Sequence, residues 1–547
     1  MIAGFFGGVW RSLSGAGLII GALFFAASLT PSLIPRGPEL QGVLGGATFA
    51  AGYGIGVFLD WLWGYLELPR GRAELRRTIV GVAALIAAAI VGYYLWNSAE
   101  WQDSIRLAMG MEPVRTAHPF TVGAIAVAVA AVLLVLARLV VGFVSFVANR
   151  PSKLVSRRIV RLVAGLAAVA FLVSLANGLL LSRAIRAADA SFAALDALIE
   201  PDTARPVDPL MTGSEASLIA WEDLGRRGRE FVSTATDKDE IEDITGRPAM
   251  RPIRVFAGLT SAETPEQRAR LALDELIRAG GFERSVLILA APTGTGWMDP
   301  AAMEPLEILH GGDVATVAVQ YSYLSSWISL LIEPGYGVEG AHQTFEAVYQ
   351  YWRELPPETR PRLYLYGLSL GAHSSEQSFN LLRIAGEPFD GALWVGPPYS
   401  TPMWRQLTAE RNPGSPAIAP VIGDGSTVRF ATQYIPPEGA AEWGPLRIVY
   451  LQYASDPVVR FEWESWIHAP DWLKEPRGPD VSPDMRWFPV VTFLQLALDN
   501  AIALHVPMGF GHLYAPEHHV DAWIEVTQPE GWTPDAVADL KALLAAR

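Results

Sequence analysis

The sequence concentrates its apolar residues in the first third of the chain, and this pattern limits the fold most strongly. Five stretches there are each close to the ~20 residues that cross a bilayer core. They lie at roughly 13–34, 42–66, 78–97, 121–146 and 159–181. They lack the polar face of a helix that covers a soluble core, although Asp60 and several glycines interrupt the second. We therefore predict an all-α transmembrane bundle of about five helices over residues 1–181.

Basic residues in the loops predict the orientation of this bundle. The loops after the second and fourth stretches are the most basic, with Arg70, Arg72, Arg76, Arg77, Arg150, Lys153, Arg157 and Arg158. Because basic loops stay in the cytoplasm, we expect the N-terminus there and, after an odd number of spans, the rest of the chain outside. The expected location is the inner (plasma) membrane, with the C-terminal part on the periplasmic or extracellular side. An error of one span would reverse this side.

The remainder of the chain has a different pattern. Residues 182–250 are polar, and we interpret them as a connector. From residue 251 on, short apolar runs typical of buried parallel strands alternate with helical segments. The strands are expected at 253–257, 285–291, 313–320, 362–366, 391–395 and 447–452. This alternation predicts a doubly wound, mostly parallel sheet over residues 251–547.

Composition excludes several classes of function. The net charge is −14 and the soluble part has no run of Lys or Arg, so we expect no nucleic-acid partner. The chain has no cysteine, which excludes disulfides and thiolate chemistry. No metal-binding motif is present, and we expect neither a metal nor a cofactor.

The segment Gly367-Leu368-Ser369-Leu370-Gly371 has the G-x-S-x-G pattern of a nucleophile elbow. A predicted strand precedes it and a predicted helix follows it, which is the context that this motif needs. The turn would expose the Ser369 hydroxyl above the sheet. The backbone N–H of Leu370 would point into the site at a helix N-terminus.

A serine hydroxyl needs a base, and the base needs an acid, in the chain order Ser, acid, His. Asp456 directly follows the strand expected at 447–452, so we predict it as the acid, in preference to Asp471, Asp480 and Asp484 in a later Pro-rich segment. His512 lies in a glycine-rich loop near the C-terminus and is the predicted base. The other candidates for the base are His505, His518 and His519.

A second oxyanion donor is expected in the loop that follows the strand at 285–291. The loop reads Pro-Thr-Gly-Thr-Gly-Trp, and its glycines allow backbone amides to approach an oxyanion closely. Thr293, Gly294 and Thr295 are the candidates. The loop lacks the Lys-Ser/Thr of a phosphate-binding P-loop.

Several segments together resemble a bacterial α/β-hydrolase family whose catalytic domain follows an N-terminal multi-spanning membrane domain. They are residues 28–36 (SLTPSLIPR), 293–297 (TGTGW), 367–371 (GLSLG), 455–457 (SDP) and 511–514 (GHLY). The resemblance implies an α/β-hydrolase domain over 251–547 and supports Ser369, Asp456 and His512 as the triad. It supplies no substrate.

A Trp-rich segment near 458–506 and an aromatic segment at 321–331 are interpreted either as an apolar cap for an acyl chain or as ordinary packing. The favoured function is a membrane-anchored serine esterase or lipase that acts on acyl esters of lipids or cell-envelope components. One alternative is an envelope acyltransferase with the same triad. Another is a non-catalytic membrane scaffold or transporter. The expected partners are the bilayer and an acyl-ester substrate, and the sequence leaves the oligomeric state open.

Overall fold

The computed structural model describes residues 13–69, 72–148, 196–199, 203–323, 334–437, 439–474 and 476–547. The chain divides into two compact units. The helical unit comprises Met1–Ile185, Phe461–Lys474 and Pro479–Val506. The α/β unit comprises Arg186–Arg460, Glu475–Gly478 and Pro507–Arg547.

Before residue 149, the described part of the helical unit holds four apolar helices: α2 (Gly15–Ser28), α3 (Pro38–Tyr65), α4 (Ala73–Ala108) and α5 (Pro119–Ala148). Within the described residues, three helices are long and apolar enough to cross a membrane, namely those at 38–65, 74–108 and 119–144. Helix α2 is apolar but has only 14 residues. The prediction of an N-terminal helical region with apolar helices is confirmed, while the predicted fifth span at 159–181 lies outside the described residues.

Two of the predicted spans differ in detail from the helices that form. The irregular second stretch is one continuous helix of 28 residues, and Asp60 lies on its exposed surface. The first stretch ends as a helix at Ser28, because the segment that follows contains Pro31 and Pro35, which cannot donate helical hydrogen bonds. Leu33 and Ile34 of that segment are nonetheless fully buried.

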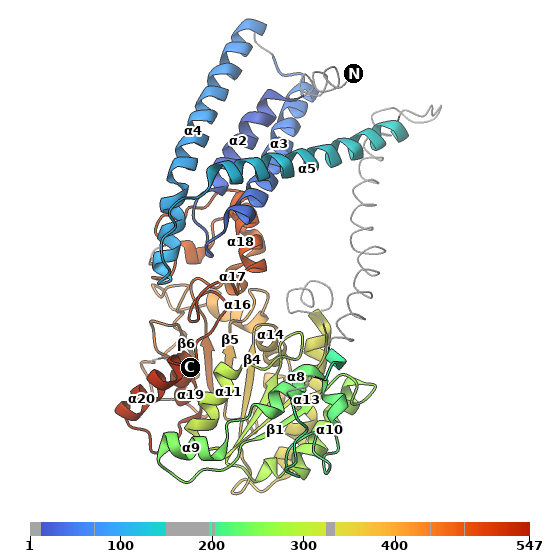
Figure 1. The fold of residues 1–547 in the computed structure, drawn as a ribbon, viewed down its shortest axis with the longest axis vertical. Coiled ribbons are helices and arrows are strands. Elements are labelled where there is room, and N and C mark those ends of the chain that lie inside the picture. Colours follow the sequence, from blue (N-terminus) through green and yellow to red (C-terminus); the bar gives the residue numbers. More distant parts are fainter. Residues whose placement is uncertain are drawn as a thin grey trace. The chain divides into compact units, whose positions relative to one another are not determined.

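The segment near the C-terminus that the sequence assigns to a cap insertion, 458–506, groups largely with the N-terminal helices. It contains the short helices η4 (Trp463–Trp466) and η5 (Asp471–Leu473) and helix α18 (Val491–Ala501). Helix α18 contacts both α2 and α3 (Figure 1). Buried polar bonds explain this grouping: the Asp499 carboxylate accepts hydrogen bonds from the Ser32 hydroxyl and the Leu33 N–H, each at 2.9 Å.

The α/β unit contains a sheet of seven strands, all parallel, which confirms the predicted fold class. The strand order is β1-β3-β2-β4-β5-β7-β6. The strands are β1 (Ile253–Ala257), β2 (Val286–Ala291), β3 (Val314–Val319), β4 (Arg362–Leu368), β5 (Gly391–Val395), β6 (Val428–Ala431) and β7 (Arg447–Leu451). Six occupy the predicted positions, and the four-residue edge strand β6 was not predicted.

Helices flank this sheet (Figure 1). Helix α10 packs against α13 and α11 packs against α19, while α14 contacts β2 and β4. The helices are η2 (Trp221–Leu224), α8 (Gly225–Ser233), α9 (Lys238–Thr245), α10 (Pro265–Arg278), η3 (Gly281–Glu283), α11 (Pro300–Leu309), α13 (Pro334–Glu354), α14 (Leu370–Glu376), α15 (Leu381–Ile384), α16 (Pro402–Ala409), α17 (Pro457–Arg460), α19 (Pro516–Thr527) and α20 (Pro534–Ala545).

The register of the central strands places the predicted site segments together. Strands β2 and β4 are neighbours, and Ala291 pairs with Gly367 at their carboxyl ends. The loop after β2 therefore begins beside the elbow after β4. Strand β5 pairs with both β4 and β7, so the segments that follow β4, β5 and β7 leave the same edge of the sheet.

Candidate active site

Ser369 lies between β4 and α14, at the strand-to-helix turn that the motif requires. Its backbone has φ 56° and ψ −123°, a conformation that residues with a side chain rarely adopt. The Ser369 N–H donates a 2.8 Å hydrogen bond to the Val395 carbonyl at the end of β5. This bond helps hold the strained turn in place.

The two glycines of the elbow are required by close backbone contacts. A Cβ on Gly367 would lie 2.4 Å from the carbonyl carbon of Gly371. A Cβ on Gly371 would lie 2.2 Å from the carbonyl oxygen of Ala291, the last residue of β2. Both distances are far below van der Waals contact, so only glycine fits at either position.

Asp456 and His512 form a hydrogen-bonded pair, although 56 residues separate them in the sequence. The distance from His512 Nδ1 to Asp456 Oδ2 is 2.7 Å, and the Asp456 side chain is fully buried. Asp456 Oδ1 also accepts the Val458 N–H at 2.8 Å, at the start of α17. An aspartate in this position fixes the histidine tautomer that leaves Nε2 free to accept a proton.

Gly396 connects this pair to the elbow. A Cβ on Gly396 would lie 2.8 Å from His512 Cε1, so the imidazole ring lies directly against this glycine. Gly396 follows Val395, whose carbonyl accepts the Ser369 N–H. Within the described residues, His512 Nε2 is buried and has no hydrogen-bond partner. The nitrogen that would act as the base is therefore uncommitted, and its ring lies against the glycine that follows the acceptor of the Ser369 N–H bond.

The other predicted histidines have different surroundings. His518 Nδ1 lies 2.6 Å from the Tyr453 hydroxyl. His519 is fully buried, its Nδ1 lies 3.1 Å from the Ala515 carbonyl, and burial lowers its pKa to about 3. His505 belongs to the helical unit, as do Asp471, Asp480 and Asp484. Of the candidates named from the sequence, Asp456 and His512 are the carboxylate and the imidazole that the structure brings together.

The oxyanion candidates lie in two places. Leu370 is the first residue of α14, where backbone N–H groups have no partner within the helix. In the loop after β2, the Thr293 N–H donates to the Trp297 carbonyl at 3.1 Å, so it is already used to close the loop. Gly294 and Thr295 lie at the tip of this turn, and the Thr295 carbonyl accepts a bond from Gln320 Nε2 at 3.2 Å.

Comparison with known protein families identifies the family of this chain. The model of a family described as "Alpha/beta-hydrolase family" matches residues 253–540. The chain belongs to this family. A second model, described as "Alpha/beta-hydrolase family N-terminus", matches residues 29–235, so the resemblance predicted from the sequence is confirmed for both parts. No curated protein and no solved structure matches the chain.

Asp299 is a buried carboxylate near His512 that was not predicted from the sequence of this α/β-hydrolase family member. Asp299 caps the N-terminus of α11, where its side chain accepts the Ala301 N–H at 3.0 Å. Burial raises its pKa to about 7, and the His512 charge partly opposes this shift. Asp-Pro at a helix start is a recognisable N-cap signal, but the sequence does not reveal that this cap is buried near His512.

Potential metal ligands are dispersed rather than clustered in the part of the hydrolase that the structure describes. Over those ranges of the chain, no group of three or more His, Asp or Glu side chains is arranged to hold a metal ion. Asp456 and His512, which do lie together, are bonded to each other through Oδ2 and Nδ1. This pairing is the arrangement of an acid that orients a base.

Proposed function

We propose that this protein is a serine hydrolase that cleaves acyl esters through an acyl-enzyme on Ser369. The observation that carries the proposal is the Asp456–His512 pair, whose imidazole lies against Gly396, next to the residue that binds the Ser369 N–H. The segments that carry Ser369, Asp456 and His512 also follow the chain order serine, acid, base that this fold uses, which supports the proposal.

In the proposed reaction, Ser369 Oγ attacks the ester carbonyl while His512 Nε2 accepts the hydroxyl proton. The Leu370 N–H, with a second amide from Gly294 or Thr295, stabilises the oxyanion. His512 then returns the proton to the departing alcohol, which leaves an acyl-Ser369 ester. Water, deprotonated by His512, attacks this ester; the bond from the acyl carbon to Ser369 Oγ then breaks, His512 returns the proton to Ser369 Oγ, and the carboxylic acid is released. Asp456 orients the imidazole and stabilises its protonated form throughout.

We further propose a lipid or cell-envelope acyl ester as the substrate, with the α/β unit outside the plasma membrane. Helices α3, α4 and α5 are long and apolar enough to hold the enzyme beside a bilayer, where such esters are concentrated. The basic loops of the sequence favour the outer side.

Labelling with a fluorophosphonate tests the chemistry, because this probe reacts with activated serines. The detergent-purified wild type should be labelled, and Ser369→Ala and His512→Ala should not. Ser374→Ala and His518→Ala are matched controls, since both residues lie in the same unit, and they should keep labelling. Strong labelling of Ser369→Ala would refute the proposal. Hydrolysis of p-nitrophenyl esters and of native lipids, with Ser369→Ala as the blank, then defines the substrate.

Labelling of single cysteines tests the location, because the chain has none of its own. Glu410→Cys places a thiol on the exposed surface of the α/β unit, and Arg76→Cys places one in the first turn of α4, in the basic segment expected in the cytoplasm. An impermeant maleimide on intact cells should label Glu410→Cys alone. The reverse pattern would show the opposite orientation.

A further inference from the structure

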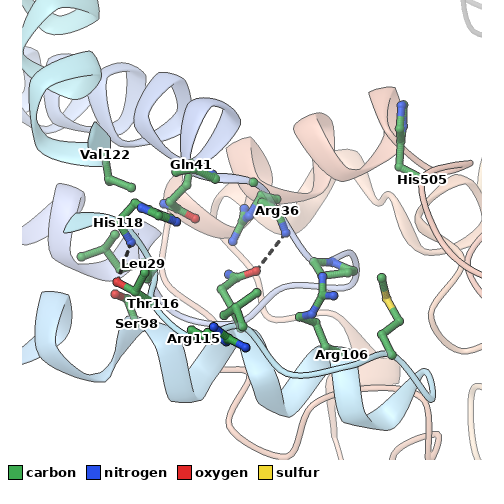
Figure 2. Close-up of a pocket in the computed structure, with 17 residues that line it drawn as sticks. Leu29, Arg36, Gln41, Ser98, Arg106, Arg115, Thr116, His118, Val122 and His505 are labelled. Atoms are coloured by element: carbon green, nitrogen blue, oxygen red, sulfur yellow. Dashed lines mark hydrogen bonds between the residues drawn. The ribbon is translucent and has the colours of Figure 1, made fainter. Parts of the chain in front are cut away.

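A cavity of about 340 Å³ lies within the helical unit, separate from the residues of the candidate active site. It is located where α4 ends and where α3 and α5 begin, so its walls come from three apolar helices and the segments that join them. Figure 2 shows the side chains gathered around it. The elbow residues 367–371 do not line this cavity, and neither does His512.

The lining carries positive charge. Three arginines, Arg36, Arg106 and Arg115, line the cavity together with His118 and His505, and no Asp or Glu is among the lining residues. Arg106 is held in place by a 2.6 Å bond from its Nε to the Glu112 carbonyl. Since like charges repel, an anion between these side chains would lower their mutual repulsion.

Arg36 provides an independent reason to expect an anion. Its side chain is fully shielded from solvent, and its Nε and Nη1 have no hydrogen-bond partner among the described residues. Asp499 lies 3.9 Å from Nη1, but its carboxylate accepts hydrogen bonds from Ser32 and Leu33 instead. A buried guanidinium with unused donors is costly, and an acceptor in the cavity would satisfy it.

Two helix N-termini face the same space. Gly37 and Pro38 at the start of α3 line the cavity, and no side chain caps this 28-residue helix. His118, directly before α5, lines it as well. The unpaired N–H groups and the positive end of a helix dipole favour an anion at each of these positions.

We propose that this cavity binds the phosphate group of a ligand, either the headgroup of an anionic phospholipid or a soluble phosphate ester. A phosphate has enough acceptor oxygens for several arginines at once, which a single carboxylate does not. Gln41 Oε1, a buried acceptor without a partner in the described structure, suits a hydroxyl of the same ligand. Leu29 and Val122 add apolar wall beside the polar groups. The proposal does not depend on the catalytic function.

Binding to the full chain in detergent tests the proposal, with three probes: dioctanoyl phosphatidylglycerol, dioctanoyl glycerol and glycerol 3-phosphate. The test variant is Arg106→Gln with Arg115→Gln. The matched control is Arg76→Gln with Arg77→Gln, which removes the same charge at the other end of α4. Phosphatidylglycerol should bind the wild type and the control equally, and the test variant about tenfold more weakly or worse. Dioctanoyl glycerol should not distinguish the variants.

The other possible results of the binding experiment each support or overturn the proposed phosphate site. If glycerol 3-phosphate binds as tightly as the lipid and depends on the same arginines, the site is supported and the ligand is a soluble phosphate ester. Equal affinity of phosphatidylglycerol for test and control variants, or no binding of either phosphate probe, would overturn the proposal. The double variant Arg106→Lys with Arg115→Lys guards against misfolding, because it should restore most of the affinity while changing the same positions.

Discussion

The Tyr514 hydroxyl donates a 2.6 Å hydrogen bond to Asp456 Oδ2, the same oxygen that lies 2.7 Å from His512 Nδ1. Burial, and then the negative charge of Asp456, raise the pKa of Tyr514 well above 10, so this hydroxyl remains a donor. The Tyr514 ring also stacks on Tyr453, with ring centroids 4.3 Å apart. Tyr514 thus holds the carboxylate that pairs with His512, and within the proposed function we assign it as a positioning residue.

Replacing Tyr514 by Phe should lower kcat about tenfold and leave KM nearly unchanged. The reason is that Asp456 loses a charge-assisted hydrogen bond and orients His512 less well, while the substrate contacts stay intact. The matched control is Tyr450→Phe, because the Tyr450 hydroxyl donates to another buried carboxylate, Glu376, at 2.7 Å. An equal fall in kcat for the two variants would show that Tyr514 acts only through stability.

The Gly396→Ala variant should lose most ester hydrolysis because its methyl group would push the imidazole of His512, whose Cε1 would be 2.8 Å away. The backbone of Gly396 also has a φ of +52°, which strains any residue with a side chain. Gly423→Ala separates the two effects, since Gly423 has a φ of +56° but nothing within 4 Å of a Cβ. Both variants should lose stability through backbone strain, Gly396→Ala the more because of the added clash, and only Gly396→Ala should lose kcat. Comparable activity in both would contradict this placement of His512.

The sequence predicted the repetitive part of the fold well, because buried parallel strands have uninterrupted apolar runs. Strand β6 escaped prediction because its four residues include Arg429, which is buried through bonds that no local pattern shows. The single helix expected after the elbow is divided into α14 and α15, since the Asn380 side chain caps a new helix there. Such local breaks depend on side-chain bonds rather than on hydrophobic periodicity.

The residues of the candidate site were predictable to the extent that a motif marks them. The elbow marks Ser369, and the strand-then-Asp pattern marks Asp456. Asp299 and Tyr514 were missed because only the fold brings Asp299 near His512 and the Tyr514 hydroxyl to Asp456. The association of Asp499 with the segment near Ser32 was equally invisible, because 467 residues separate the two.

Asp299→Asn should stabilise the protein, and more so at high pH. Burial gives Asp299 a folded-state pKa of about 7, whereas the ordinary value is 3.8. Unfolding therefore releases a proton between these values, so the stability present below about pH 4 is lost as the pH rises through 7. Asn keeps the cap on α11 and has no proton to release. The Tm advantage of the variant should grow from about pH 5 to about pH 8, to on the order of 5 °C.

The control for this variant is Asp237→Asn, which makes the same change at the exposed N-cap of α9. Its Tm difference from the wild type should stay constant over the same pH range. A pH-independent Tm difference would mean that Asp299 is ionised in the folded protein.

The last prediction concerns the stability of the helical unit and depends on the ion pair of Arg36 and Asp499. Both side chains are fully shielded from solvent, and Asp499 also accepts the bonds from Ser32 and Leu33. Asp499→Ala should therefore destabilise this unit by about 3–5 kcal/mol, because it leaves a buried guanidinium uncompensated and two donors unpaired. Replacing both partners, as Arg36→Met with Asp499→Leu, should recover a large part of that loss. Thermal unfolding of the full chain in detergent measures the double-mutant cycle, and additive single effects would show that the two residues do not interact.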